Sequence, residues 1–161
     1  MKIAIYAGSF DPITLGHLDI IRRSLDIFDK LIIGVGYNVR KQCSFSIDER
    51  IQMIKDSLEG ERSQNFEVEV FDNLLVDFAK EKNAGFIIRG VRSFSDFDYE
   101  LQMTMTNQSL SPDLETVFLL PKKEYMFVSS SLVRELAHFK KDFSSYVPES
   151  VIKMFNKKFN E

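Results

Sequence analysis

Apolar positions in this chain follow two alternating patterns. Short segments rich in strand-forming residues lie at 2–7, 31–37, 66–71, 86–89 and 116–120. Between them, apolar residues recur every three or four positions, as Leu18, Ile21, Leu25 and Phe28 do. That spacing is typical of amphipathic helices. It predicts a helix at about 15–28. The capping box Ser-Ile-Asp-Glu at 46–49 begins a second helix at 47–58, and Pro148 suits the beginning of a last helix at 149–158. We expect further helices at about 74–82, 95–110 and 130–139.

Strands that alternate with helices predict an α/β protein. We expect a Rossmann-like, five-stranded, mostly parallel sheet with helices on both faces, because crossover connections are right-handed. With no linker or repeat in the pattern, the expectation is one domain over 1–161, with the C-terminal helices at about 130–158 packed on it. Ligands of such folds bind beyond the carboxyl ends of the strands, so candidate residues are sought just after strands.

Composition and charge exclude several classes of function. The formal net charge of −3 disfavours a general nucleic-acid binder. A single cysteine, Cys43, excludes an internal disulfide, and His17 lies too far along the chain from His138 to suggest a structural zinc site. The first apolar run is too short for a signal peptide, and none approaches the roughly 18 residues of a membrane span. We therefore expect a cytoplasmic protein with no membrane partner.

The segment after the first strand has features that suit phosphate binding. Gly-Ser-Phe-Asp-Pro at 8–12 is followed by Thr14, Leu15, Gly16 and His17, where the first helix begins. A first helical turn offers unpaired N–H groups and a partial positive charge to an anion. Gly16 would let phosphate approach the backbone, and His17 would point toward the same anion. The alternative is an ordinary turn with a structural histidine.

Two later strand ends carry similar chemistry. Arg89 and Arg92 flank Gly90 after the fourth strand, and a guanidinium presents a planar fork of donors that matches phosphate oxygens. Three serines at 129–131 precede the fifth helix. Serines there are usually caps, but they also offer hydroxyls and amides to an anion. The alternative for the arginines is surface charge on a loop.

These segments together resemble a known family. Gly-Ser-Phe-Asp-Pro with Thr-x-Gly-His is similar to the T/HxGH nucleotidyltransferases and, within them, to the phosphopantetheine adenylyltransferase family. Ile-Arg-Gly-Val-Arg at 88–92, Asp-Phe-Asp-Tyr-Glu at 96–100 and Tyr-Met-Phe-Val-Ser-Ser-Ser at 125–131 extend the resemblance, which runs from Lys2 to about Pro148. Departures are mild: Ser9 stands where threonine is common and keeps the hydroxyl, and Cys43 replaces a frequent loop proline.

The resemblance implies a reaction and a set of residues. The reaction is adenylyl transfer from ATP to 4′-phosphopantetheine, with Mg²⁺ on the ATP phosphates and a homohexameric assembly. His17 is implied as the catalytic residue that stabilises the transition state. Implied ATP-binding residues are Ser9, Phe10, His17, Gly90, Val91, Arg92, Glu100, Tyr125, Met126, Phe127, Val128, Ser129, Ser130 and Ser131. Implied acceptor-binding residues are Ser9, Lys41, Leu75 and Arg89.

The implied chemistry needs no general base. A phosphate monoester has a second pKa of about 6, so the attacking group is largely dianionic at neutral pH. In-line attack without a covalent enzyme intermediate therefore suits a sequence that offers no Ser-His-Asp or Cys-His arrangement. Two alternatives stay open. One is a sister enzyme, such as a nicotinamide-nucleotide adenylyltransferase or a cytidylyltransferase; the other is a non-catalytic nucleotide-binding module.

Overall fold

The computed structural model describes residues 1–37, 43–61 and 65–159. Its strands are β1 (Ile3–Gly8), β2 (Lys30–Gly36), β3 (Phe66–Phe71), β4 (Phe86–Gly90) and β5 (Glu115–Leu119). Its α-helices are α1 (Leu15–Ile27), α2 (Ile47–Ser57), α3 (Leu75–Glu81), α4 (Phe94–Leu110), α5 (Ser130–His138) and α6 (Glu149–Phe159). Each is an element that the sequence predicts. Two short 3₁₀ helices, at Lys123–Tyr125 and Ser144–Tyr146, are additional.

The five strands form one parallel sheet in the order β3-β2-β1-β4-β5. The predicted fold class is therefore confirmed. From β1 the chain builds outward to β2 and β3, then crosses back to the other side of β1 to begin β4. This reversal places a topological switch point between β1 and β4. Tyr6 lies opposite Ile88 in the register, so the carboxyl ends of the two strands, Gly8 and Gly90, lie side by side.

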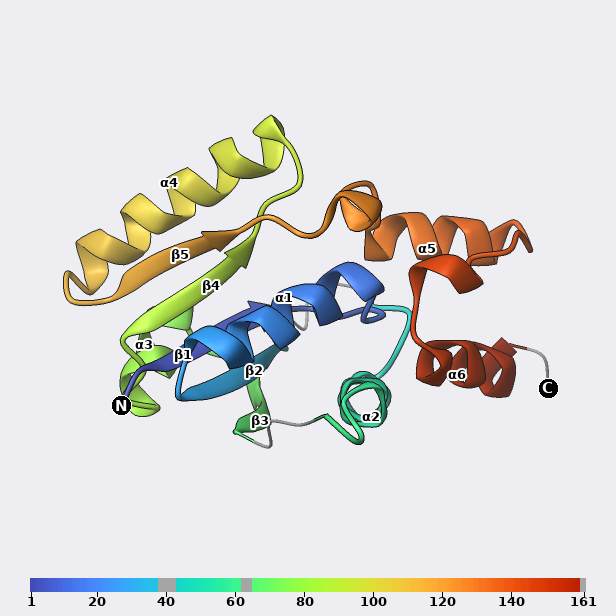
Figure 1. Ribbon diagram of the computed structural model, residues 1–161, viewed down its shortest axis with the longest axis horizontal. Helices are drawn as coiled ribbons and strands as arrows, with labels where there is room; N and C mark the ends of the chain where they lie inside the picture. Colours follow the sequence, from blue (N-terminus) through green and yellow to red (C-terminus); the bar gives the residue numbers. More distant parts are fainter. Residues whose placement is uncertain (38–42, 62–64, 160–161) are drawn as a thin grey trace.

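Alternation along β1 divides the apolar residues between two cores. Ala4 and Tyr6 belong to a core shared with residues of α1, α2, α5 and α6. Ile5 and Ala7 belong to a second core on the opposite face, which α3 covers. In Figure 1, α1 lies in front of the sheet and α3 behind it. Helices thus cover both faces, as right-handed crossovers require.

The C-terminal helices extend the first core beyond the sheet. Phe155 on α6 packs edge-on against Phe45, with ring centroids 4.9 Å apart. The Ser57 and Ser150 hydroxyls are 2.7 Å apart, which joins the end of α2 to α6. Figure 1 shows α5 and α6 at one end of the molecule, beside α2 and the beginning of α1. This arrangement brings α5 to the switch-point edge of the sheet.

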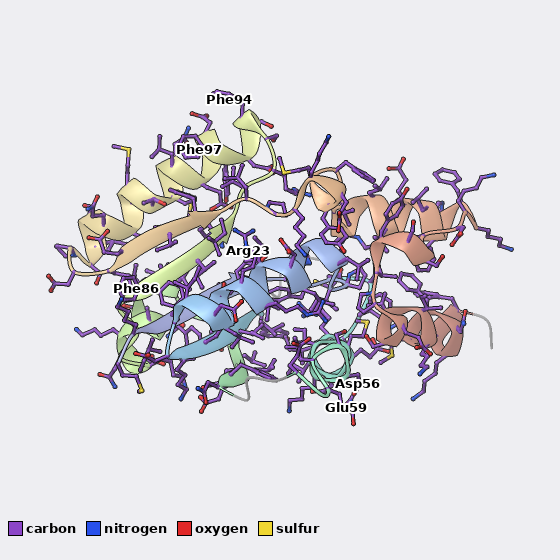
Figure 2. All side chains as sticks on the ribbon, in the orientation of Figure 1. Arg23, Asp56, Glu59, Phe86, Phe94 and Phe97 are labelled. Atoms are coloured by element: carbon purple, nitrogen blue, oxygen red, sulfur yellow. The ribbon has the colours of Figure 1, made fainter. Side chains whose placement is uncertain are left out.

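Helix α4 is packed differently from the others. None of its residues is fully buried. Phe94, at its beginning, is 93% exposed and projects away from the rest of the chain (Figure 2). Phe97 contacts Phe118 of β5, so the helix lies along the edge strand. Among the described residues, no helix combines the length and apolar character needed to cross a membrane.

Candidate active site

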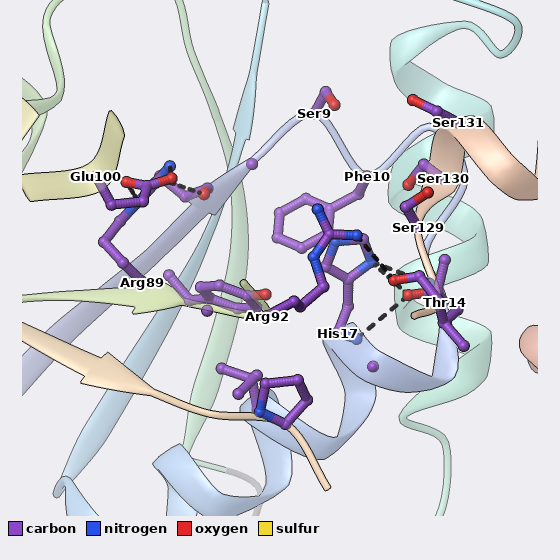
Figure 3. A pocket seen from close by; sticks show the side chains of 18 of the residues that line it. Ser9, Phe10, Thr14, His17, Arg89, Arg92, Glu100, Ser129, Ser130 and Ser131 are labelled. Atoms are coloured by element: carbon purple, nitrogen blue, oxygen red, sulfur yellow. Dashed lines mark hydrogen bonds and ion pairs between the residues drawn. The ribbon is translucent and has the colours of Figure 1, made fainter. Parts of the chain in front are cut away.

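A cavity of about 290 Å³ opens at the switch point. Its walls come from the end of β1 and the loop that follows, the first turn of α1, the end of β4, Glu100 of α4 and the first turn of α5 (Figure 3). Eleven of the site residues implied by the sequence line it: Ser9, Phe10, His17, Arg89, Gly90, Arg92, Glu100, Val128, Ser129, Ser130 and Ser131. Segments separated by up to about 120 residues of sequence therefore meet at one site. The site lies beyond the carboxyl ends of the strands, where α/β folds of this kind bind their ligands.

The loop after β1 is held in a defined shape by buried polar groups. Phe10 has a φ of +45°, in the left-handed region that residues other than glycine seldom adopt. The buried Asp11 carboxylate accepts from the two N–H groups at 44–45, at 2.9 Å each. The guanidinium of buried Arg50 donates to the Ser9 carbonyl oxygen at 2.8 Å. These bonds keep the unusual backbone in place, so the loop is ordered before any ligand arrives.

The Thr-x-Gly-His spacing has a local structural meaning. Thr14 is the N-cap of α1 and His17 is the third residue of the helix, so the two form a capping box. The Thr14 hydroxyl accepts from the His17 N–H at 3.4 Å. The Thr14 N–H donates to His17 Nδ1 at 3.0 Å (Figure 3). The box needs a side-chain acceptor at the third position, and here an imidazole supplies it.

The same bond fixes the protonation state of His17. A backbone N–H can only donate, so Nδ1 must be unprotonated and the ring hydrogen lies on Nε2. Burial, together with the nearby charge of Arg92, lowers the pKa of His17 from 6.5 to about 4. His17 is therefore neutral at physiological pH. It presents Nε2–H as a donor that takes no partner among the described residues.

Gly16, the second residue of α1, leaves room for a ligand. A Cβ added there would meet the Thr14 hydroxyl and the Tyr125 Cβ at 3.6 Å, which is ordinary contact distance. The fold itself therefore does not require glycine at this position. Gly16 lines the cavity, and close approach of a phosphate to the first-turn amides at this position stays a prediction.

Two arginines at the end of β4 make different bonds. The Arg89 guanidinium donates to both Glu100 carboxylate oxygens at 2.5 Å and to the Ala7 carbonyl at 3.1 Å (Figure 3). Arg92 donates to Asp96 at 3.1 Å and to the Val128 carbonyl at 3.0 Å. Arg89 is thus joined to the Glu100 side of the cavity, whereas Arg92 connects β4 with the segment that leads into α5.

The serines at the beginning of α5 serve the fold as well as the cavity. Ser129 is the N-cap, and its hydroxyl accepts from the Leu132 N–H at 3.1 Å. The Ser130 hydroxyl donates to the Pro12 carbonyl at 2.7 Å, which ties α5 to the loop after β1. The capping alternative is therefore correct for Ser129, but it does not compete with anion binding. Both α1 and α5 bring N-terminal turns to the cavity, and each carries partial positive charge.

Sequence reasoning missed two residues of the cavity wall that carry polar groups. Arg134 donates to the Asp11 carbonyl at 2.6 Å and to the Ser131 hydroxyl at 3.2 Å. The sequence could have indicated Arg134, because it follows Ser130 by four residues and residues four apart lie on one face of a helix. The other is Tyr6, whose signal was a hydroxyl within an otherwise aliphatic strand.

Comparisons with known proteins agree with this geometry. Residues 5–136 match the model of the cytidylyltransferase-like family. The chain is 48% identical over 158 residues to the phosphopantetheine adenylyltransferase of Alkaliphilus metalliredigens, covering 98% of this chain and 99% of that one. It is 47% identical over 161 residues to the enzyme of the same name from Caldanaerobacter subterraneus subsp. tengcongensis, covering 100% and 99%. The chain belongs to the phosphopantetheine adenylyltransferase family.

A solved structure extends the likeness to the fold. A putative nicotinate-nucleotide adenylyltransferase from Vibrio parahaemolyticus superposes with a TM-score of 0.70 at 18% identity, covering 98% of this chain and 93% of that one. At that identity the likeness shows the fold alone. Membership of the phosphopantetheine adenylyltransferase family rests on the full-length relatives, whose identity is far higher.

Six residues implied by the family are not among those that line the cavity. Leu75 lines a neighbouring groove of about 170 Å³ that shares Arg89 and Glu100 with the cavity. Val91 is buried, and the side chain of Phe127 is 60% exposed with its ring against Tyr146. Tyr125 and Met126 do not line the cavity either. Lys41 lies outside the described residues, and the roles of all six stay predictions.

Proposed function

We propose that this chain transfers the adenylyl group of ATP to 4′-phosphopantetheine and so makes dephospho-coenzyme A and pyrophosphate. The observation that carries the proposal is the composition of the cavity: a neutral histidine donor, two helix N-terminal turns and three guanidinium groups surround one space at the switch point. That is a site for polyanions. The full-length relatives that carry this activity in their names support the choice of reaction.

The chemistry is a single displacement at phosphorus. An oxygen of the acceptor phosphate forms a bond to the α-phosphorus of ATP while the bond to the pyrophosphate oxygen breaks. The attacking group is already a dianion near pH 7, so no residue needs to remove a proton. His17 Nε2–H donates to a non-bridging oxygen of the α-phosphate as negative charge builds there. Because His17 is neutral, it gives this hydrogen bond without losing its proton.

The main barrier is repulsion between the two substrates. Two like unit charges about 4 Å apart repel by roughly 4 kcal/mol at an effective dielectric constant of 20. Arg92, Arg134 and the N-terminal turns of α1 and α5 offset this repulsion on the nucleotide side. Arg89 does so on the acceptor side, with Lys41 as a second cation that stays a prediction. Catalysis then comes mainly from positioning and electrostatic stabilisation.

The groove beside the cavity suits the uncharged arm of the acceptor. Apolar side chains line much of it, Leu75, Val76, Met103 and Leu110 among them. Arg89 borders both the groove and the cavity. An acceptor with its phosphate at Arg89 therefore places its pantetheine arm along Leu75 and its reacting oxygen toward the nucleotide.

We propose that Mg²⁺ enters with the nucleotide. Among the described residues, no group of three or more His, Cys, Asp or Glu side chains is placed to hold a metal ion. Mg²⁺ keeps several waters and takes many of its ligands from substrate phosphates, so the donor set of the cavity fits an ion bound chiefly to ATP. Bound there, it neutralises charge on the phosphates.

The homohexamer is also a proposal. Helix α4 leaves Phe94, Tyr99, Met105 and Leu110 more than half exposed. Large apolar side chains left exposed along one helix support an interaction surface there, and a second copy of the chain would cover part of it. The cytoplasmic location stays a prediction.

The deciding experiment is pyrophosphate release from ATP, with and without 4′-phosphopantetheine. We expect release only when both are present, with dephospho-coenzyme A as the second product. The same assay with nicotinamide mononucleotide, nicotinate mononucleotide, and CTP with a phosphorylated alcohol tests the sister activities. Faster turnover with one of these would replace the proposal. Binding of ATP without pyrophosphate from any acceptor would indicate a non-catalytic module.

A further inference from the structure

Tyr6 is a buried tyrosine at the end of the central strand β1. It is 6% exposed, lies opposite Ile33 of β2 and Ile88 of β4, and belongs to the core on the α1 face. Its ring packs edge-on against Phe10, with centroids 5.5 Å apart, and lies 6.3 Å from the ring of His17. Phenylalanine would fill the same space, so packing explains the ring and leaves the hydroxyl unexplained.

The hydroxyl makes no hydrogen bond with the described part of the chain. Buried tyrosine hydroxyls usually find a partner, and among the described residues no side-chain oxygen or nitrogen closed off from solvent lacks one. The Tyr6 hydroxyl must therefore reach an open surface. Tyr6 lines the cavity at the switch point, so the surface that it reaches is the cavity wall.

The surroundings keep this hydroxyl protonated and direct it at a polar ligand. Burial raises the pKa of the Tyr6 phenol well above its usual value, although the charges of Arg89 and Arg92 oppose this and Glu100 adds to it. The group is therefore a neutral donor and acceptor near two guanidinium groups. Gly90 lies beside it, since a Cβ there would be 3.5 Å from the hydroxyl oxygen. Glycine at 90 thus keeps the space next to the hydroxyl open.

We infer that Tyr6 is a nucleotide-binding residue whose hydroxyl forms a hydrogen bond with an oxygen atom of bound ATP. This rests on the proposed function, because the cavity is taken to hold ATP. A sugar hydroxyl and a phosphate oxygen both offer the required chemistry. Either would give the Tyr6 hydroxyl the partner that the chain itself does not supply, at no cost to the packing of the ring.

The test is Tyr6→Phe, with ATP binding measured by calorimetry in the absence of any acceptor. Because the chain loses no internal hydrogen bond, we expect the melting temperature without ligand to stay the same or rise. The dissociation constant for ATP should rise about tenfold, the effect of losing one hydrogen bond to a polar or charged group. Tyr146→Phe is the matched control, since Tyr146 does not line the cavity and the substitution keeps its ring against Phe127. It should bind ATP as the unchanged protein does.

Different results separate the inference from the proposed function. If the unchanged protein binds no ATP, the proposed function itself fails. If it binds ATP and Tyr6→Phe binds equally well, only the inference about Tyr6 is wrong. If Tyr6→Phe raised only the KM for the acceptor, the inference would also be wrong, because the hydroxyl would then face the other substrate.

Deoxynucleotides identify the partner oxygen. Binding of 2′-deoxy-ATP and 3′-deoxy-ATP is measured for the unchanged protein and for Tyr6→Phe. If the partner is a sugar hydroxyl, the deoxynucleotide that lacks this hydroxyl should have the same dissociation constant for the unchanged protein and for Tyr6→Phe. If it is a phosphate oxygen, Tyr6→Phe weakens every nucleotide by the same factor. Both patterns support the inference, whereas no loss with any nucleotide contradicts it.

Discussion

His17 has two roles in this structure, and substitutions can separate them. Its Nδ1 accepts from the Thr14 N–H at 3.0 Å and completes the capping box, while its Nε2–H faces the ligand. Glutamine and glutamate are the usual residues at this position of a capping box. His17→Gln and His17→Glu should therefore keep both bonds of the capping box. His17→Ala keeps the bond to the Thr14 hydroxyl but loses the acceptor for the Thr14 N–H, and should be less stable by about 1 kcal/mol.

Turnover should follow a different order from stability. Removing a single donor that stabilises transition-state charge typically costs about 10²- to 10³-fold, so His17→Ala should lose that much in kcat. His17→Glu loses the donor and adds a negative charge, which at about 4 Å from a phosphate costs roughly a further 4 kcal/mol. His17→Gln keeps an N–H of shorter reach and should be the most active of the three. We thus expect Ala to be the least stable variant and Glu the least active.

The assay pairs two measurements on the same preparations. Urea unfolding without ligand gives the free energy of unfolding, and pyrophosphate release at saturating substrates gives kcat. Wild-type turnover by His17→Ala or His17→Glu, which lack the donor, would remove His17 from the catalytic role. Turnover that simply tracks stability across the series would show that the histidine serves only the helix cap.

Three further predictions concern other parts of the site. Gly16→Ala should not lower the melting temperature, because an added Cβ makes only ordinary contacts. Since Gly16 lines the cavity, the same change should raise the KM for ATP roughly tenfold. A lower melting temperature with unchanged KM would contradict this. Arg89→Ala should raise the KM for the acceptor more than the KM for ATP, and Arg92→Ala should do the reverse. The reason is that Arg89 borders the acceptor groove and Arg92 does not. An equal rise in both KM values would refute that division. Between pH 6.5 and 4 the unfolded chain protonates His17 while the folded protein does not, so the free energy of unfolding should decrease as the pH is lowered through that window. The decrease should be about 3 kcal/mol larger for the unchanged protein than for His17→Gln. An equal pH dependence of the free energy of unfolding in the two proteins would disprove the low pKa.

The sequence predicted the fold well because two periodicities carry most of the information. Every strand and α-helix lies close to the residues at which the sequence predicted it, and the capping box at Ser46 and Glu49 forms as its pattern indicated. The short 3₁₀ helix at Lys123–Tyr125 has no such pattern, since one turn is too short to show a period. The order of the strands in the sheet was not predicted, because the spacing of apolar residues within a segment does not show which strands pair.

The site was predicted less completely than the fold. Family segments located His17 and Arg89, but they gave no sign that Arg89 is bonded to Glu100, because that pair depends on how α4 lies along β5. Tyr6 looked like a core residue, and only its unpartnered hydroxyl distinguishes it. The proton on His17 Nε2 could not be placed before the bond from Thr14 was known.

The central claim is that the adenylyl group passes from ATP to the acceptor in a single step. The stereochemical course at the α-phosphorus tests this claim most directly. The substrate is ATP made chiral at that phosphorus with sulfur in place of one non-bridging oxygen, and the configuration of the dephospho-coenzyme A analogue is determined. A single in-line displacement between two anions bound side by side inverts the configuration, which is the result we expect. Retention would mean two displacements through a covalent enzyme intermediate, and the mechanism built on His17, Arg89 and Arg92 would be wrong.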